Sequence, residues 1–230
     1  MKNAIKSVLF IVVLVSCFSA LGQSCSDYYP MEKGVSFELT HFNDKGKEDA
    51  VRRNTIIEDS IGVAVINTVV TDVNGKETIN AEYKITCDTE NVTIDINEVL
   101  SETLKSALSE SDKEVTALVI GGNLIVPNDL KQEQILPNSD IEMDVEVGDL
   151  KLKFRVKTTD RKVVGEERIS VPAGNFDCIV ISQKVETKMM MTKRGESKIW
   201  LAQGVGVVKQ EDYDEQGKVI ASEKLTKFSK

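Results

Sequence analysis

The sequence predicts a mainly β fold of antiparallel strands joined by hairpins, with one short helix. Two observations carry this prediction. Runs in which apolar and polar residues alternate fill most of the chain from residue 35 onward, as expected of strands with one buried face. Three turn signals, at 43–47, 72–76 and 214–218, each place Gly-Lys three residues after an Asp or Asn. Because Gly supplies the positive φ of a hairpin turn, each signal indicates two neighbouring antiparallel strands.

The N-terminus has the pattern of a secretory signal. Lys2 and Lys6 are followed by an almost unbroken apolar run from 7 to 20, which is too short and wrongly flanked for a membrane span. No later segment approaches ~18 consecutive apolar residues. We therefore expect an exported protein with no transmembrane span in the mature chain.

Two cleavage sites compete at the end of this signal. Small residues at both key positions of 20–22 favour cleavage there, which leaves 23–230 as a soluble exported chain. The segment 14–17 resembles a bacterial lipobox, in which Cys17 would carry the lipid. We favour the first site because the apolar run continues past Cys17 to Leu21, and a lipoprotein anchored through Cys17 is the alternative.

Composition narrows the functional class. The chain has 230 residues, 41% of them hydrophobic and 29% charged, which is typical of a folded protein. Removal of 1–22 takes away two lysines and no acid, which leaves 27 basic against 37 acidic residues and makes nucleic acid a poor partner. The single histidine, His41, excludes two-His zinc and iron sites within one chain. No paired carboxylates or phosphate-binding loop stand out, so we expect no enzyme, metal site or cofactor.

The first half of the mature chain contains strands and the helix. Val35, Phe37 and Leu39 alternate with polar residues, and 61–66 is a β-branched run, so both segments are predicted strands. From 97 to 111 apolar residues recur at helical spacing, which predicts a short amphipathic helix. We expect its apolar stripe to pack on the sheet; the stripe comprises Leu100, Leu104, Ala107 and Leu108.

Charge patterning predicts one hairpin in detail. Apolar residues alternate with acids in 141–147 and with Lys or Arg in 150–157, and Gly148-Asp149 turns the chain between them. Opposite charges across the solvent face stabilise such a pair by a few tenths of a kcal/mol each. The apolar sets then share the other face, so the sheet has one wet and one dry side.

Further strands are predicted at the C-terminal end, and the longest polar loop precedes them. The loop covers 127–140 and holds two prolines. No low-complexity linker divides the chain, so we expect 23–230 to be a single antiparallel domain, with any seam in this loop. The further strands are expected at 162–171, 176–191, 196–203, 205–213 and 218–228.

Three cysteines matter for the folded chain. In an oxidising envelope, one disulfide and one buried thiol are the simplest account of three. Cys178 alternates with Phe176 and Val180, so we expect it in the core. The segment between Cys25 and Cys87 is predicted to form four strands, and an even number of strands returns the chain to the end where it started. We therefore predict a Cys25–Cys87 disulfide.

The run Met189-Met190-Met191 is unusual in composition. Thioether sulfur can bind copper, but alternate strand residues face opposite sides, so at most Met189 and Met191 could share a ligand. A plastic apolar surface, either core or cavity lining, accounts for the run better. Trp200 lies on the next predicted strand and could extend that surface. Met189, Met191 and Trp200 are therefore the candidate ligand-binding residues.

Three segments of the chain resemble one known family. They are C-S-D-Y-Y-P-M-E-K-G at 25–34, V-P-A-G-N-F-D-C at 171–178 and W-L-A-Q-G-V-G-V-V-K at 200–209. Together they are similar to the TapB-like family of exported envelope proteins, over nearly the whole mature chain. The resemblance implies a curved antiparallel sheet similar to the half-barrel of the lipoprotein carriers LolA and LolB, whose concave face holds acyl chains. It implies no catalytic residue.

Two functions remain compatible with the sequence. The first is a non-enzymatic protein of the periplasm or cell envelope that binds a hydrophobic ligand, either a lipid or acyl chain or an apolar peptide, on the concave face of its sheet. The alternative is a structural or interaction protein, accessory to a surface appendage or an outer-membrane assembly, whose edge strands pair with an envelope protein.

Overall fold

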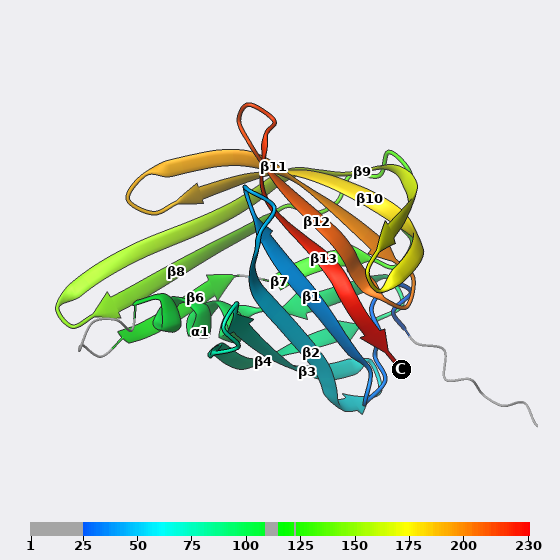
Figure 1. Ribbon diagram of the computed structural model, residues 1–230, viewed down its shortest axis with the longest axis horizontal. Coiled ribbons are helices and arrows are strands. Elements are labelled where there is room, and N and C mark those ends of the chain that lie inside the picture. Colours follow the sequence, from blue (N-terminus) through cyan, green and yellow to red (C-terminus); the bar gives the residue numbers. More distant parts are fainter. Residues whose placement is uncertain (1–24, 109–114, 122) are drawn as a thin grey trace, which may run out of the picture.

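The computed structural model describes residues 25–108, 115–121 and 123–230, which form one antiparallel sheet of thirteen strands and one helix (Figure 1). This confirms the predicted mainly β fold. The signal segment and both cleavage sites lie outside the described residues. The elements are β1 (Ser36–Asn43), β2 (Glu48–Ser60), β3 (Val63–Asp72), β4 (Glu77–Cys87), β5 (Asn91–Asp95), α1 (Asn97–Leu108), β6 (Val115–Gly121), β7 (Asn123–Pro127), β8 (Ser139–Val147), β9 (Leu150–Val171), β10 (Gly174–Lys188), β11 (Thr192–Ala202), β12 (Gly206–Asp214) and β13 (Val219–Ser229).

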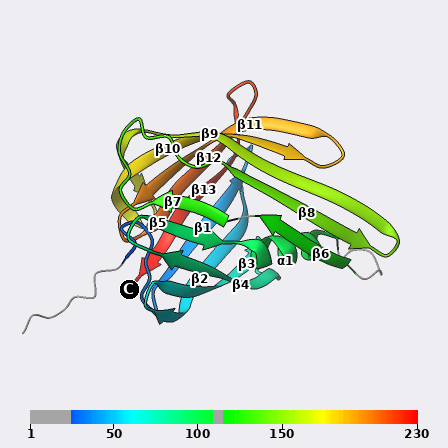
Figure 2. The ribbon, with the colours of Figure 1, turned by 180° about the vertical axis from the view of Figure 1, so that it is seen from behind.

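The sheet curls into a nearly closed barrel. Its strands follow the order β6-β8-β9-β10-β11-β12-β13-β1-β2-β3-β4-β5-β7, so the first strand of the chain pairs with the last. The two ends of the sheet, β6 and β7, are consecutive in sequence: β6 pairs with β8, and β7 pairs with β5 (Figure 2). One stretch of chain therefore forms both edges, and the predicted half-barrel is curled almost to closure.

The loop after β7 covers the remaining gap on one side. Its backbone bonds to β9 through Glu133 N to Val163 O (2.9 Å) and Leu136 N to Arg161 O (2.8 Å). Leu130 and Leu136 are buried in a core cluster together with Tyr28. The polar loop predicted at 127–140 is present between β7 and β8, and it packs into the barrel.

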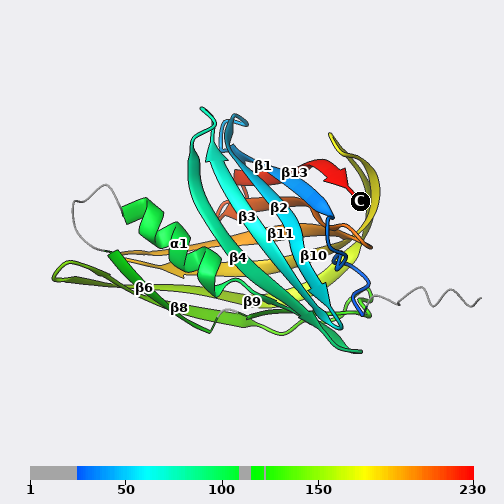
Figure 3. The same ribbon diagram turned by 90° about the horizontal axis from the view of Figure 1, so that it is seen from below.

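The helix covers the other side of the gap. Helix α1 lies between β4 and β6 and contacts both (Figure 3). Leu100 and Leu104 pack against a cluster that includes Ile141, Met143 and Val145 of β8, which confirms that this part of the predicted stripe faces the sheet. The expected last residues of the helix, 109–111, lie outside the described range. Within that range no helix is long and apolar enough to cross a membrane.

The predicted charged hairpin is confirmed as β8–β9. Glu146 stands opposite Lys151 and Asp144 opposite Lys153, and both pairs are within salt-bridge distance, at 2.7 and 3.0 Å. Arg155 stands opposite Glu142 but donates to Asp140 through Nε (2.7 Å). All of these side chains are exposed, so the pairs contribute little stability each.

The prediction that one strand ends near 157 and another begins at 162 is wrong. Strand β9 runs through this stretch from Leu150 to Val171. The irregularity is a bulge, because Ser182 of β10 pairs with Lys162 whereas Lys184 pairs with Thr159. Asp160 adopts a positive φ of 53° inside it. A bulge of this kind bends a strand and re-aims a side chain, and here it carries Arg161.

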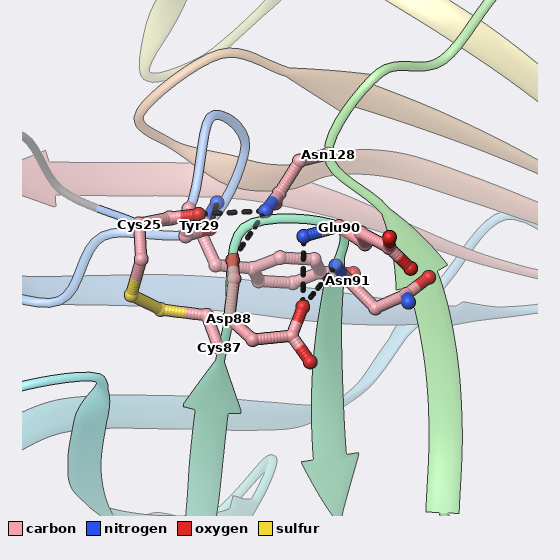
Figure 4. The surroundings of a disulfide bond; sticks show 8 residues. Cys25, Tyr29, Cys87, Asp88, Glu90, Asn91 and Asn128 are labelled. Atoms are coloured by element: carbon pink, nitrogen blue, oxygen red, sulfur yellow. Dashed lines mark hydrogen bonds between the residues drawn. A yellow bond between two sulfur atoms is a disulfide. The ribbon is translucent and has the colours of Figure 1, made fainter.

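The predicted disulfide joins the N-terminal segment to the end of β4 (Figure 4). Cys25 and Cys87 are bonded, with their Cα atoms 5.7 Å apart and the four strands β1–β4 between them. The side chain of Asn128 donates to Cys25 O (2.7 Å) and to Asp88 O (3.0 Å), which ties the N-terminal segment to the β4–β5 turn and to the end of β7. Cys178 is a buried free thiol, as predicted.

Candidate functional site

The interior of the barrel contains a cavity of about 230 Å³. Strands β1–β5, β7 and β9–β12 contribute to its wall, together with Val99 of α1 and Tyr29 of the N-terminal segment. These strands come from both halves of the sheet, so the concave face of the sheet forms the wall of the cavity. A ligand was expected on this surface from the sequence.

Apolar side chains form the floor of the cavity at the disulfide end. Two buried clusters meet there, one built on β2–β5 and the other on β7, β9, β10, β11 and the loop after β7. Ile85 and Ile94 belong to the first cluster and Val126, Ile181 and Leu201 to the second, and all five line the cavity. An apolar molecule would contact aliphatic side chains from both halves of the barrel at this level.

Polar side chains lie further along the same strands, away from the disulfide. On β2 the inward-facing residues run Ile56, Asn54 and Arg52, and Asn54 stands opposite Thr68 of β3. On β10 Ile181 is followed by the inward-facing Gln183. Burial raises the pKa of the Tyr83 phenol, another wall residue, to about 12, so this hydroxyl remains a hydrogen-bond donor at neutral pH. The cavity therefore has an apolar end and a polar end.

Arg161 is the most distinctive of these polar residues. Arg161 is only 4% exposed. Its guanidinium donates to Pro137 O (2.6 Å), Ile125 O (3.2 Å) and Gln183 Oε1 (3.2 Å). All three acceptors are neutral. Burial lowers the pKa of Arg161 from its ordinary value, an effect that the nearby Tyr29 phenol partly opposes. The bonds from Arg161 to Ile125 of β7 and to Pro137 of the following loop also tie these two segments to β9.

Arg52 is the second arginine on the cavity wall, and its charge is balanced. Its Nη2 donates to Glu223 Oε2 of β13 at 2.6 Å. No Asp or Glu is among the described residues that line the cavity. The wall therefore carries two guanidinium groups, of which Arg161 has no carboxylate partner within the described chain.

Several buried polar atoms beside the cavity lack a hydrogen-bond partner among the described residues. They include Nδ2 of Asn54 and Oγ1 of Thr68, and both residues are almost completely buried on the cavity wall. Nε of Arg52 is a third such atom. A buried polar group without a partner costs about 1–3 kcal/mol, so three of them around one cavity favour a polar group bound among them.

A second hollow, of about 620 Å³, lies near the tip of the β9–β10 hairpin. Its lining includes Glu166, Glu167, Arg168 and Asp177, all of them exposed. Glu166 and Glu167 are adjacent on β9 and therefore point to opposite faces, and Asp177 stands opposite Arg168, whose Nε lies 3.8 Å from its carboxylate. Among the described residues no group of three or more His, Cys, Asp or Glu could hold a metal. Burial raises the pKa of the Cys178 thiol, which borders this hollow, to about 11 and makes it a poor nucleophile.

The structure does not bring the three predicted ligand-binding residues together. Met189 and Met191 lie at the turn between β10 and β11, where they are 53% and 72% exposed. Trp200 is 5% exposed and belongs to a cluster with Cys178 and Val180. Its indole donates to Glu167 (2.8 Å). None of the three lines the interior cavity, whereas the neighbours of Trp200 on β11, Ile199 and Leu201, do.

Sequence reasoning missed the polar side of the cavity. Thr68 follows the buried Ala64 and Ile66 on β3, and Asn54 follows the inward Ile56 on β2, so the change from apolar to polar at inward positions was the available signal. Arg161 gave no such signal, because the bulge that orients it interrupts the alternation of β9. Its partners on β7 and in the following loop also come from distant sequence.

The fold and this cavity define the class of protein: one antiparallel sheet curled into a nearly closed barrel, with a small amphipathic cavity inside. The chain belongs to the DUF3108-like family, whose model matches residues 32–225. No curated protein matches the chain. The narrower resemblance to TapB-like proteins stays a prediction.

Two crystal structures share the fold. One is a Bacteroides fragilis protein whose name describes it as exported and YmcC-like in fold; it is 19% identical, with a TM-score of 0.72, and the match covers 90% of this chain and 100% of that one. The other is a Parabacteroides distasonis protein named as a lipoprotein, also 19% identical, with a TM-score of 0.70 and the same coverage. At this identity the likeness establishes a YmcC-like fold.

Proposed function

We propose that this protein is a non-enzymatic binding protein of the cell envelope that holds an acyl chain or a similar apolar molecule inside its barrel. The observation that carries the proposal is the cavity of about 230 Å³, with aliphatic side chains from both halves of the barrel at its closed end. A mostly apolar lining with a few placed polar groups is the usual form of a small-molecule site.

The envelope location is supported by the N-terminal signal pattern and the disulfide. One relative of the same fold is named as exported and the other as a lipoprotein, which agrees with a location outside the cytoplasm. Disulfides persist in oxidising compartments, and the Cys25–Cys87 bond fits such a compartment. His41 supports a non-enzymatic function, because it lies at the surface, paired with Asp49 and away from both hollows.

An accessory role in an outer-membrane or appendage assembly is the second candidate, and we rank it lower. That role would require a long free strand edge to pair with a partner. The two edge strands, β6 and β7, have seven and five residues, and α1 and the loop after β7 lie against them.

The test is binding of an uncharged apolar probe to the mature chain purified without detergent. 1-Octanol, whose chain of eight carbons matches the cavity of about 230 Å³, should give a binding signal in titration calorimetry. Ile199→Trp, which fills the cavity, should abolish the signal, whereas Ile61→Trp at a fully exposed site should leave it unchanged. Equal probe binding by both variants, each folded by circular dichroism, would remove the support for this function.

A further inference from the structure

We infer that the molecule held in the barrel is a single-chain carboxylate of medium length, whose carboxylate group binds Arg161 and whose chain lies over the apolar floor. This inference rests on the proposed function and adds the charge and the size of the ligand. Three observations support it: the unbalanced charge of Arg161, the absence of acids from the described wall, and the volume of the cavity.

The first observation concerns the charge. Moving an ion into a protein interior is costly unless an opposite charge balances it, and the acceptors that Arg161 contacts in the described part of the chain are all neutral. Among the atoms that the structure describes, these bonds use Nε and Nη1. The two N–H groups of Nη2 can therefore donate to a bound ligand. A carboxylate accepts such bonds strongly, because both partners are charged.

The second observation concerns selection between charges. Apart from its signal the chain carries 27 basic and 37 acidic residues, so its surface is acidic as a whole, yet no described residue on the cavity wall is acidic. Asn54 adds an amide donor without a partner and Thr68 a hydroxyl without one. An amine would face two guanidinium groups and no carboxylate, whereas an anion would meet donors on several sides.

The third observation concerns size. A methylene group fills about as much space as a water molecule, for which the liquid volume is about 30 Å³. The cavity of about 230 Å³ then holds roughly eight such groups. A phospholipid with two long chains would exceed this volume several times, so a free carboxylate of about eight carbons fits better than a lipid headgroup that carries a phosphate.

Titration calorimetry with the mature protein tests the inference. We use sodium octanoate, 1-octanol and octylamine as probes of equal chain length. Octanoate should bind at least tenfold more tightly than octanol, and octylamine most weakly. Arg161→Met should remove the preference for octanoate while octanol binds within threefold of wild type. Arg194→Met, at an exposed arginine near the β10–β11 turn, serves as the matched control and should keep the preference.

The outcomes separate the two proposals. If none of the three probes binds, the proposed function fails. If octanol binds as tightly as octanoate, or if the preference survives in Arg161→Met, the barrel binds apolar molecules but the role of Arg161 is wrong. If carboxylates with chains well beyond eight carbons bind at least tenfold more tightly than octanoate, the size argument is overturned.

Arg161 also ties β9 to β7 and to the following loop, so Arg161→Met could fail to fold. A measurement on the wild-type protein covers that case. The carboxyl carbon of ¹³C-labelled octanoate reports the pKa of the bound acid by NMR. A guanidinium partner lowers that pKa below the value of the free acid. A bound pKa equal to or above the free value would overturn the inference without any variant.

Discussion

Removal of the Cys25–Cys87 disulfide is the sharpest test of how the closed end is stabilised. The two cysteines are 62 residues apart in sequence, and the bond joins the N-terminal segment to the end of β4. In the chain-entropy model a crosslink over a loop of this length restricts the unfolded chain by about 14 cal/mol/K, or about 4 kcal/mol at 25 °C. The double variant Cys25→Ser/Cys87→Ser should lose that much stability.

Urea denaturation followed by circular dichroism measures the loss. For a chain of this size 4 kcal/mol corresponds to a fall in Tm of roughly 10 °C. The control is Cys178→Ala, a variant of the third cysteine, which has no part in the crosslink. If the double variant is within 1 kcal/mol of wild type, or if a reducing agent leaves wild-type stability unchanged, the crosslink does not stabilise the chain as argued.

Three further predictions concern single groups. Burial raises the pKa of Glu38, but hydrogen bonds from Lys227 and two other residues outweigh it, so the folded-state pKa lies below the unfolded value of about 4.3. Glu38 therefore stabilises the fold above pH ~4.3, and this stabilisation is lost as the pH falls through its folded-state pKa. Glu38→Gln should lower the free energy of unfolding by about 1–3 kcal/mol at pH 7. In urea titrations at several pH values it should also reduce the loss of stability at acid pH, and an unchanged pH profile would contradict this. Dilute peroxide should oxidise the exposed Met189–Met191 well before the buried Met143, as peptide mass spectrometry would show, and equal rates would refute the placement of the turn. At pH 8 Cys178 should stay unreactive to iodoacetamide until urea unfolds the chain, because its thiol has a pKa of about 11; rapid labelling of the folded protein would contradict its burial.

Local patterns in the sequence predicted most of the fold. The β8–β9 hairpin was found with the correct turn and the correct faces because its charges lie on one face and its apolar residues on the other. The disulfide followed from counting strands between two cysteines. Both inferences depend on neighbours in sequence, and a meander of hairpins keeps most contacts between such neighbours.

The candidate site could not be found in the same way. Met189 and Met191 were expected on a continuous strand, but the chain turns at that point, so both side chains lie outside the barrel. Trp200 was placed on the correct strand, and its alternation with Ile199 puts it on the opposite face from the cavity. Arg161 depends on a bulge and on partners 24 and 36 residues away, which no periodic pattern reveals.

The pairing of β1 with β13 has a consequence for how the chain folds. Thr40 and Thr226 donate and accept one hydrogen bond across this pair although they are 186 residues apart. Closing a loop of that length costs about 5 kcal/mol of chain entropy, so this contact forms late and the barrel should fold slowly. Until the last strand arrives, β1 and β12 each present an unpaired edge, which is a template for association with other chains. A chain that lacks Val219–Ser229 should therefore aggregate during synthesis or transport.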